Sequence, residues 1–367
     1  MEHFARFVVR RRRLVLLIAV LLLIPSLLGA VATYINYDIL TYLPAELDSM
    51  IGEGYLEDDF HMASTAMITV ENMPTAETLK MKDELAAVPG VRKVVWTSDM
   101  LSVEVPSKML PKDVQDFFYN KTGATMLLVQ FEGTSASAET MQAIGEIKTI
   151  LRKDCFIGGM SAILADTKSL IDQEIPLYVL CAVGCSLVVL FLSLKSTVVP
   201  FIFMLGLLFP IAYNFGTNIF LGSISYITEA LATVLQLGVT MDFSIFLLHR
   251  FEEEQQNMGG GELSAQQVEE CMMRAICNTA SSISASSLTT IAGFLAMCTM
   301  SLTLGADIGV VMAKGVALGV ECTVTVLPAL LMQFRRPIER FSHRTLIPKL
   351  PRTARFVTRF YAPLLVV

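Results

Sequence analysis

The stretch LQLGVTMDFSIFLLHRFEEE, from Leu235 to Glu254, decides how this chain folds. With the residues before it, its apolar part is long enough to cross a lipid bilayer as a helix. It ends in His249, Arg250 and three glutamates, which mark a boundary between membrane and water. Asp242 stands two helical turns inside the apolar part. Because a carboxylate at the centre of a spanning helix costs about 2.5–3.5 kcal/mol on insertion scales, Asp242 indicates a functional position facing other helices.

The whole chain has the composition of a multi-pass membrane protein. Of its 367 residues, 53% are hydrophobic and 17% are charged, and the mean hydropathy is +0.58. Soluble domains rarely reach this balance. The apolar runs predict six spanning helices, at 14–34, 175–194, 197–217, 224–248, 283–303 and 308–333. A seventh begins near Phe356, and since the chain then ends within 12 residues, we expect it to be a half-length fragment.

The first predicted helix also resembles a signal peptide, because Arg10–Arg13, an apolar core and the small residues Ala30–Ala32 follow one another. Its apolar run of about 21 residues is long for a signal peptide, which favours an uncleaved membrane anchor. Basic residues cluster before this helix and after the sixth, so both clusters are predicted to be cytoplasmic. The intervening region 35–173 is then outside, and it carries 21 acidic and 11 basic residues.

This arrangement predicts four regions in a cell-membrane protein. They are the cytoplasmic N-terminus with the first helix (1–34), an extracytoplasmic domain (35–173), a five-helix bundle (174–334) with a cytoplasmic loop at 249–282, and a basic cytoplasmic linker with the start of a seventh helix (335–367).

Alternating strands and helices are predicted in the extracytoplasmic domain. The strands are expected at 64–71, 91–97, 124–132 and 155–159, and the helices at 75–88, 111–120 and 137–153. The order β-α-β-α-β-α-β is typical of a small α/β sandwich of the split ferredoxin-like, porter type. A last helix, about 161–174, is expected to run directly into the second spanning helix. In the cytoplasmic loop, Ser264 and Gln267 match a capping box and predict an amphipathic connector helix along the membrane surface, to about Asn278.

Four further charged residues lie in the predicted membrane helices or directly before one of them. Asp307, Lys314 and Glu321 are spaced by seven and therefore share roughly one helix face. By depth, Glu229 and Lys314 could form an intramembrane pair, and structural pairing is the expected role of Glu229, Lys314 and Asp307. Glu321 is the nearest of these residues in depth to Asp242.

Asp242 and Glu321 are thus the candidates for a proton relay, although a static hydrogen-bonded carboxylate is the alternative for Asp242. Gly238 lies one turn above Asp242 and is predicted to allow a neighbouring helix to pack closely.

These residues carry a resemblance to a known family. LGVTMDFSIFLLHRFEEE resembles the fourth-helix signature of the MMPL branch of the resistance–nodulation–division (RND) transporters. SSLTTIAGFLAM (286–297) and DIGVVMAKGVALGVECTVTVLPALL (307–331) resemble the fifth and sixth helices of that family. The layout of one helix, a large external domain and five helices agrees as well, and the five-helix unit is similar to that of sterol-sensing-domain proteins.

The resemblance implies a transporter that exports lipids, lipid-like molecules or drugs, driven by the proton-motive force. Asp242 matches the proton-relay carboxylate of the family, whereas Phe243 replaces a residue that is often tyrosine and therefore supplies no hydroxyl. Complete members contain two such halves, so the implied partners are the bilayer, a hydrophobic substrate, and a second half of the same chain or a partner in a dimer or trimer.

Other functional classes find little support in the sequence. It contains no phosphate-binding loop and no GxSxG, and its four histidines are not spaced as metal ligands. We therefore expect no enzymatic activity, no cofactor, no metal, no nucleotide and no nucleic-acid partner. The competing hypothesis is a lipid-sensing or accessory membrane protein that is built on the same five-helix unit and does not transport.

Overall fold

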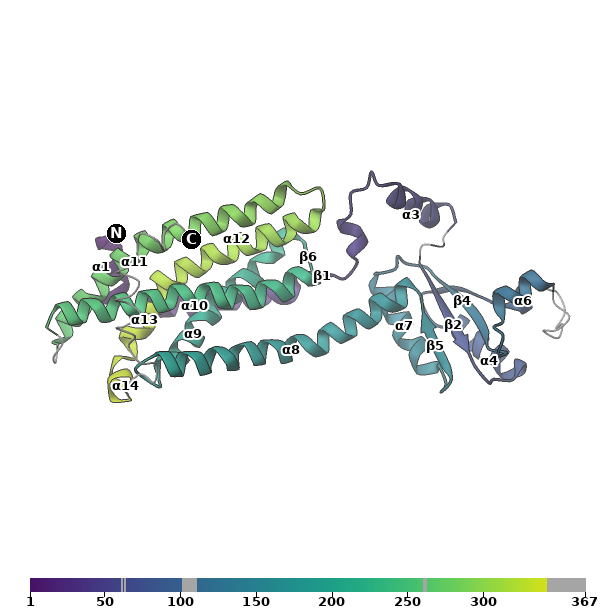
Figure 1. Ribbon diagram of the computed structural model, residues 1–367, viewed down its shortest axis with the longest axis horizontal. Coiled ribbons are helices and arrows are strands. Elements are labelled where there is room, and N and C mark those ends of the chain that lie inside the picture. The colour runs from purple at the N-terminus through teal and green to yellow at the C-terminus, as the bar shows by residue number, and fades with distance from the viewer. Residues whose placement is uncertain (61, 63, 101–110, 260–262, 342–367) are drawn as a thin grey trace, which may run out of the picture.

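A computed structural model describes residues 1–341 of the protein, apart from residues 61, 63, 101–110 and 260–262. The molecule is elongated, with a bundle of long helices at one end and a small sheet with its own helices at the other (Figure 1). We call these parts the bundle and the sheet unit. The predicted seventh helix lies outside the described residues.

Six helical segments of the bundle are long and apolar enough to cross a membrane. They comprise α2 (Arg12–Ala32), α8 (Met160–Ser193), α9 (Val199–Thr217) with η3 (Asn218–Leu221), α10 (Tyr226–Asn257), α11 (Ala265–Ala296) with η4 (Met297–Thr299), and α12 (Thr303–Val324) with α13 (Val326–Gln333). The six helices expected from the apolar runs are therefore confirmed. Two short helices, α1 (Glu2–Arg10) and α14 (Arg335–Arg340), lie at the end of the bundle far from the sheet unit (Figure 1).

The connector between α10 and α11 differs from the expectation. The capping box forms, because Ser264 accepts from the Gln267 amide and Gln267 accepts from the Ser264 amide. The helix that it starts is not a separate surface helix, however, but continues as α11 to Ala296. Neither glycine nor proline occurs between Asn278 and Ile283 to interrupt it. The predicted surface helix was therefore wrong.

The sheet unit contains four strands, β2 (Thr65–Val70), β3 (Val91–Val95), β4 (Thr125–Phe131) and β5 (Cys155–Gly158). They form an antiparallel sheet in the order β3-β4-β2-β5, which is the strand order of a ferredoxin-like sandwich. The crossover helices α4 (Thr75–Ala86) and α7 (Ala138–Ile150) supply Met81, Leu85, Ile144 and Ile147 to its core. Residues alternate between buried and half-buried along β4, as expected for a sheet with one face packed on helices.

Shorter elements complete the fold. They are β1 (Tyr34–Asn36), η1 (Ile39–Tyr42), α3 (Asp48–Asp58), α5 (Thr97–Met100), α6 (Lys112–Phe118) and β6 (Ser223–Ser225). β1 follows α2 and pairs in parallel with β6, which precedes α10. This two-stranded contact lies at the end of the bundle that faces the sheet unit (Figure 1). As expected, the helix that leaves the sheet unit runs without interruption into the membrane, because α8 extends from Met160 to Ser193.

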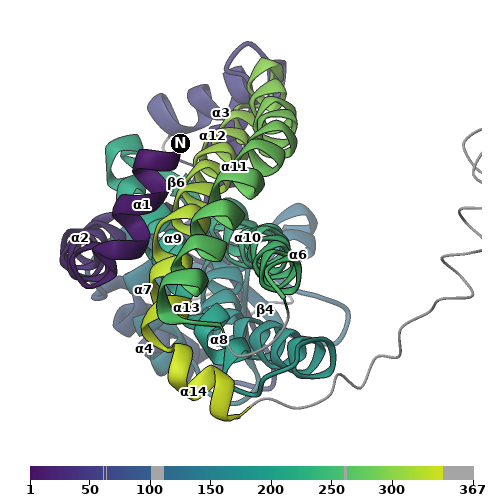
Figure 2. The ribbon, with the colours of Figure 1, turned by 90° about the vertical axis from the view of Figure 1, so that its left-hand side faces the viewer.

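Close helix packing joins α2 to α9, which lie side by side (Figure 2). A Cβ atom on Gly216 would lie 2.3 Å from the backbone of Ser26, and one on Gly29 would lie 2.2 Å from the Gly216 carbonyl oxygen. Only glycine permits such an approach, and small residues are the usual means by which membrane helices pack. This contact attaches α2 to the other helices.

We predict that Gly216→Ala pushes α2 away from α9, because the added methyl group would meet backbone atoms of Ser26. The loss of stability should exceed the roughly 1–3 kcal/mol that overpacking usually costs. The measurement is the thermal unfolding midpoint of purified protein in detergent. Gly184→Ala on α8, where a Cβ meets open space, is the matched control. Equal midpoints for the two variants would contradict the inferred packing.

Candidate functional site

Two faces of α10 differ in chemistry. The face turned toward α12 is polar and buried, and it includes Gln236, Thr240 and Ser244. Gly319 of α12 packs directly on Thr240, since a Cβ on this glycine would lie 2.6 Å from the threonine hydroxyl oxygen. The two helices therefore meet along a line of small and polar residues.

Gln236 is the centre of a hydrogen-bond network between three helices. Its amide nitrogen donates to the carbonyl oxygens of Pro210 (3.0 Å) and Gly315 (3.2 Å), and its amide oxygen accepts from the Asn214 side chain (2.8 Å). Gln236 is 1% exposed and Asn214 is 0% exposed. Because no water competes for these groups in a membrane, the network holds α9, α10 and α12 in one register.

Lys314 joins the same network instead of forming the expected pair with Glu229. Its ammonium donates to the Asn214 carbonyl oxygen (3.1 Å) and to the Asn218 side-chain oxygen (2.5 Å). Within the described part of the chain, no carboxylate forms an ion pair with Lys314. Asn214 and Asn218 are visible in the sequence, but only the packing of α9 on α12 brings them beside Lys314.

Asp307 binds the beginning of α10. Its Oδ2 atom accepts from the Ser225 amide (2.8 Å) and the Thr228 hydroxyl (2.5 Å). A carboxylate at this end of a helix also interacts favourably with the helix dipole. Glu229, one residue after Thr228, instead lies within electrostatic range of Asp172 on α8. The three residues for which we expected mutual pairing thus have three different surroundings.

The opposite face of α10 is exposed and contains Asp242. Leu235, Gly238 and Phe246 lie one turn apart on the same face, and they are also exposed. A Cβ on Gly238 would meet no atom within 4 Å, so this glycine does not pack against any described helix. No hydrogen bond or ion pair joins Asp242 to another described side chain. We call this face the Asp242 stripe.

Asp242 and Glu321 do not meet in this structure. Thr240 and Gly319 form the contact between α10 and α12, and each carboxylate follows its contact residue by two positions. Two residues rotate a helix by about 200°, which turns both carboxylates away from the contact. Glu321 is exposed and lies within electrostatic range of Tyr213 on α9.

Phe243 has a packing role. Its ring is 8% exposed and packs with Ile283 of α11 and Val316 of α12. The Phe243 ring therefore lies on another face of α10 than the Asp242 stripe.

The exposed face of α11 next to the stripe consists mostly of small residues, including Ser282, Ala285, Ser286 and Gly293. The hydroxyl of Ser282 donates back to the carbonyl of Asn278, within its own helix. α10 and α11 pack against each other, and Phe246 of the stripe lines the same pocket as Ser281 and Ser282 of α11, so the two faces are neighbours there. Among the described residues, no group of three or more histidine, cysteine, aspartate or glutamate side chains is placed to hold a metal ion.

Six apolar helices with polar groups hydrogen-bonded between them define a multi-pass membrane protein. The profile of the MMPL family matches residues 41–361 of the sequence. The chain belongs to this family, and the resemblance seen in its fourth to sixth membrane helices is thereby confirmed.

Three relatives illustrate the range of similarity. A membrane protein of Methanocaldococcus jannaschii is 31% identical over 104 residues, which cover 28% of this chain and 25% of that protein. A membrane protein of Streptomyces coelicolor is 24% identical over 80% of this chain and 35% of its own length. The heme uptake protein MmpL11 of Mycobacterium tuberculosis is 26% identical over 49% of this chain and 20% of its own length.

The chain thus matches about a third or less of the length of each of these proteins. Among solved structures, SecDF in its super-membrane-facing form is 17% identical, with a TM-score of 0.41, over 90% of this chain and 38% of that one.

Proposed function

We propose that this chain is half of a transporter that uses the proton-motive force to export lipids, lipid-like molecules or drugs. The Asp242 stripe carries the proposal. It combines an exposed carboxylate with a glycine that has open space above it, on a helix long enough to span the membrane. Lipid is a poor environment for the carboxylate, so another protein helix must cover the stripe.

The covering element in this proposal is the second half of the full-length protein, or a second copy of the chain. Gly238 provides room for its close approach, and the small residues of α11 extend the same surface. A carboxylate enclosed between two bundles can bind a proton from one side of the membrane and release it to the other. Protonation neutralises it, which changes how strongly the two bundles attract each other.

The transported molecule belongs to a hydrophobic class in this proposal, because the protein lies in the bilayer and the MMPL family resemblance implies such substrates. One relative is named for heme uptake, so heme belongs in the panel of tested compounds. Lipid and drug profiling of cells that lack the full-length gene identifies the molecule and its direction of movement.

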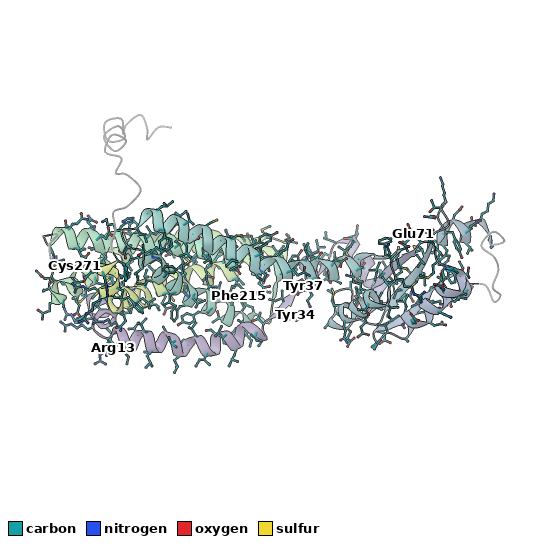
Figure 3. The ribbon with its side chains drawn as sticks, turned by 90° about the horizontal axis from the view of Figure 1, so that it is seen from below. Arg13, Tyr34, Tyr37, Glu71, Phe215 and Cys271 are labelled. Atoms are coloured by element: carbon teal, nitrogen blue, oxygen red, sulfur yellow. The ribbon has the colours of Figure 1, made fainter. Side chains whose placement is uncertain are left out.

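We further propose that the sheet unit is extracytoplasmic and that the N-terminus is cytoplasmic. The Arg residues at 10–13 and in α14 lie at the bundle end far from the sheet unit (Figures 1 and 3). Basic residues concentrate on the cytoplasmic side of membrane proteins. A tag inserted at Gly133 should be labelled by an impermeant reagent in intact cells, and a tag at Gly259 only after permeabilisation. Labelling of both tags in intact cells would rule out this topology.

For the relay, we predict that Asp242→Asn in the full-length protein abolishes transport driven by a pH gradient. The amide retains the size and hydrogen-bonding ability of the carboxylate but cannot take up a proton. The amount of protein in the membrane should be unchanged, because Asp242 has no hydrogen-bond or ion-pair partner among the described residues. Transport is measured as substrate efflux from proteoliposomes with an imposed pH gradient.

Asp307→Asn is the contrasting variant, since Asp307 binds the beginning of α10 and should affect stability more than proton coupling. If Asp242→Asn transports at the normal rate, the carboxylate is no relay, and Asp242 is only a structural polar residue.

For the covering helix, we predict that Gly238→Leu in the full-length protein abolishes transport while the six-helix unit keeps its thermal stability. The added side chain fills open space in this unit but occupies the volume that a covering helix needs. Gly184→Leu on α8 is the matched control, because its Cβ also meets open space and it lies on a different helix from the Asp242 stripe. Normal transport by Gly238→Leu would show that no helix packs closely on the stripe.

A further inference from the structure

The face of α10 that contains Asp242 continues to the end of the bundle that lies far from the sheet unit. Phe246, His249 and Glu253 follow Asp242 at intervals of four, three and four residues, and all four side chains are exposed. This spacing keeps them on one face of the helix. The face therefore leads from the stripe carboxylate to the end that the proposed topology places in the cytoplasm.

A polar pocket lies on this face, between α10 and α11. Its volume is about 510 Å³. Phe246, His249 and Glu253 line it from α10, and Asn278, Ser281 and Ser282 line it from α11. Charged, amide and hydroxyl groups thus surround a space that holds several water molecules, since one water occupies about 30 Å³ in the liquid.

His249 differs from the other polar groups of the pocket, because most of these are already bound. The guanidinium of Arg250 lies 2.6 Å from the Glu253 carboxylate and 3.4 Å from that of Glu254. The Asn278 amide donates to Glu254 (3.1 Å). Within the described residues, no hydrogen bond or ion pair involves His249. Histidine is also the side chain that most readily gains and loses a proton near neutral pH.

The other charges near the pocket come from α11 and α1. On α11, Arg274 donates to Glu270 (2.7 Å). α1 packs on α11, and its N-terminal ammonium and Glu2 lie within electrostatic range of Cys277, which also lines the pocket. Charges of both signs therefore border the pocket, and none of them is bound to His249 in the part of the chain that the structure describes.

Water has to bridge His249 and Asp242. Seven residues separate them, which is about 10 Å along a helix, whereas the donor and acceptor of a hydrogen bond lie about 3 Å apart. Phe246, which lines the pocket, follows Asp242 by four residues, or about 6 Å of helix. Water in the pocket thus comes within about one helical turn of the stripe carboxylate.

The two directions along α10 from Asp242 differ in the space that they offer. Gly238, one turn toward the sheet unit, allows a covering helix to approach closely. One turn in the other direction, at Phe246, the polar pocket begins. A helix that packs on Gly238 would exclude lipid from the stripe and leave the pocket as its water-filled end.

We propose that this pocket is the cytoplasmic opening of the proton path and that His249 passes protons between Asp242 and the cytoplasm. This inference rests on the proposed transport function and adds a residue to it. A proton leaves the Asp242 carboxyl group and moves through pocket water to the unprotonated nitrogen of the His249 ring. Asp242 is then negative and the imidazolium positive. The imidazolium gives a proton to cytoplasmic water, and His249 is neutral again.

Proton flux through the full-length protein tests this role. The protein is reconstituted into liposomes made from the lipid extract of its own membrane, which supplies hydrophobic substrate, and pyranine in the lumen reports the decay of an imposed pH gradient. Asp242→Asn defines the rate without the relay. His249→Gln remains polar but accepts no proton. It should slow the flux at least tenfold, because a positioned acid–base group contributes roughly 10²–10⁴-fold and pocket water replaces only part of this.

Rescue by free imidazole separates proton transfer from a structural role. His249→Ala should be slow as well, and added imidazole, which fits the vacated space, should restore at least half of the wild-type flux. Liposomes of Asp242→Asn with the same imidazole correct for its diffusion through the lipid. His3→Gln is the matched control, because His3 on α1 is also exposed at this end of the bundle and does not line the pocket.

Wild-type flux in His249→Gln would overturn the proposal, as would a loss in His249→Ala that imidazole does not restore. An equal loss in His3→Gln would also overturn it. If Asp242→Asn loses its flux whereas His249→Gln keeps it, only the role of the pocket is overturned and the proposed relay stands. If Asp242→Asn keeps its flux, the relay itself is overturned, and with it the path from the pocket to Asp242.

Discussion

The hydrogen bonds of Gln236 determine the architecture of the bundle. A membrane interior has no water to satisfy an amide, so Gln236 must find its partners on neighbouring helices, and it binds Asn214, Pro210 and Gly315. These bonds set the heights of α9 and α12 against α10. Lys314, Asp307 and the Thr240–Gly319 contact then occupy the positions that this register gives them.

Once α10 has turned Gln236 and Thr240 inward, its opposite face has to point away from α12. Asp242 lies on this opposite face, and its exposure is a consequence of the same register. The bundle therefore separates two kinds of polar group. Those between α9, α10 and α12 are hydrogen-bonded to one another, whereas the carboxylate on the stripe has no hydrogen-bond or ion-pair partner among the described residues. This separation is the physical basis of the proposed function.

A second structural feature is the connection between the bundle and the sheet unit. Two segments of described chain run between these parts, the connector after β1 and the continuous helix α8, and Tyr37 joins them by its hydrogen bond to Asp172. A rigid helix transmits displacement at one end to the other, which a flexible linker does not. α8 thus connects the four-stranded sheet directly to the bundle, because it begins two residues after β5.

The sequence by itself determined the elements, because their signals are local. Apolar runs predicted the six membrane helices, alternation and turn residues predicted the four strands, and Ser264 with Gln267 predicted the beginning of α11. It also singled out Asp242, since a charge in an apolar run is visible without coordinates. It misplaced the end of the connector helix, because serine and alanine between Asn278 and Ile283 neither favour a break nor exclude one.

Only the tertiary structure decided which residues meet. Depth along the helices placed Glu229 level with Lys314, but rotation about the helix axes turned Lys314 toward Asn214 and Asn218 and left Glu229 beside Asp172. The same rotation separated Glu321 from Asp242 and placed Phe243 in an apolar cluster. Rotation is set by the packing of all neighbouring helices together, through contacts such as that of Gly216 with Ser26. Spacing in one segment contains no information about this packing, because the partner surfaces lie elsewhere in the chain.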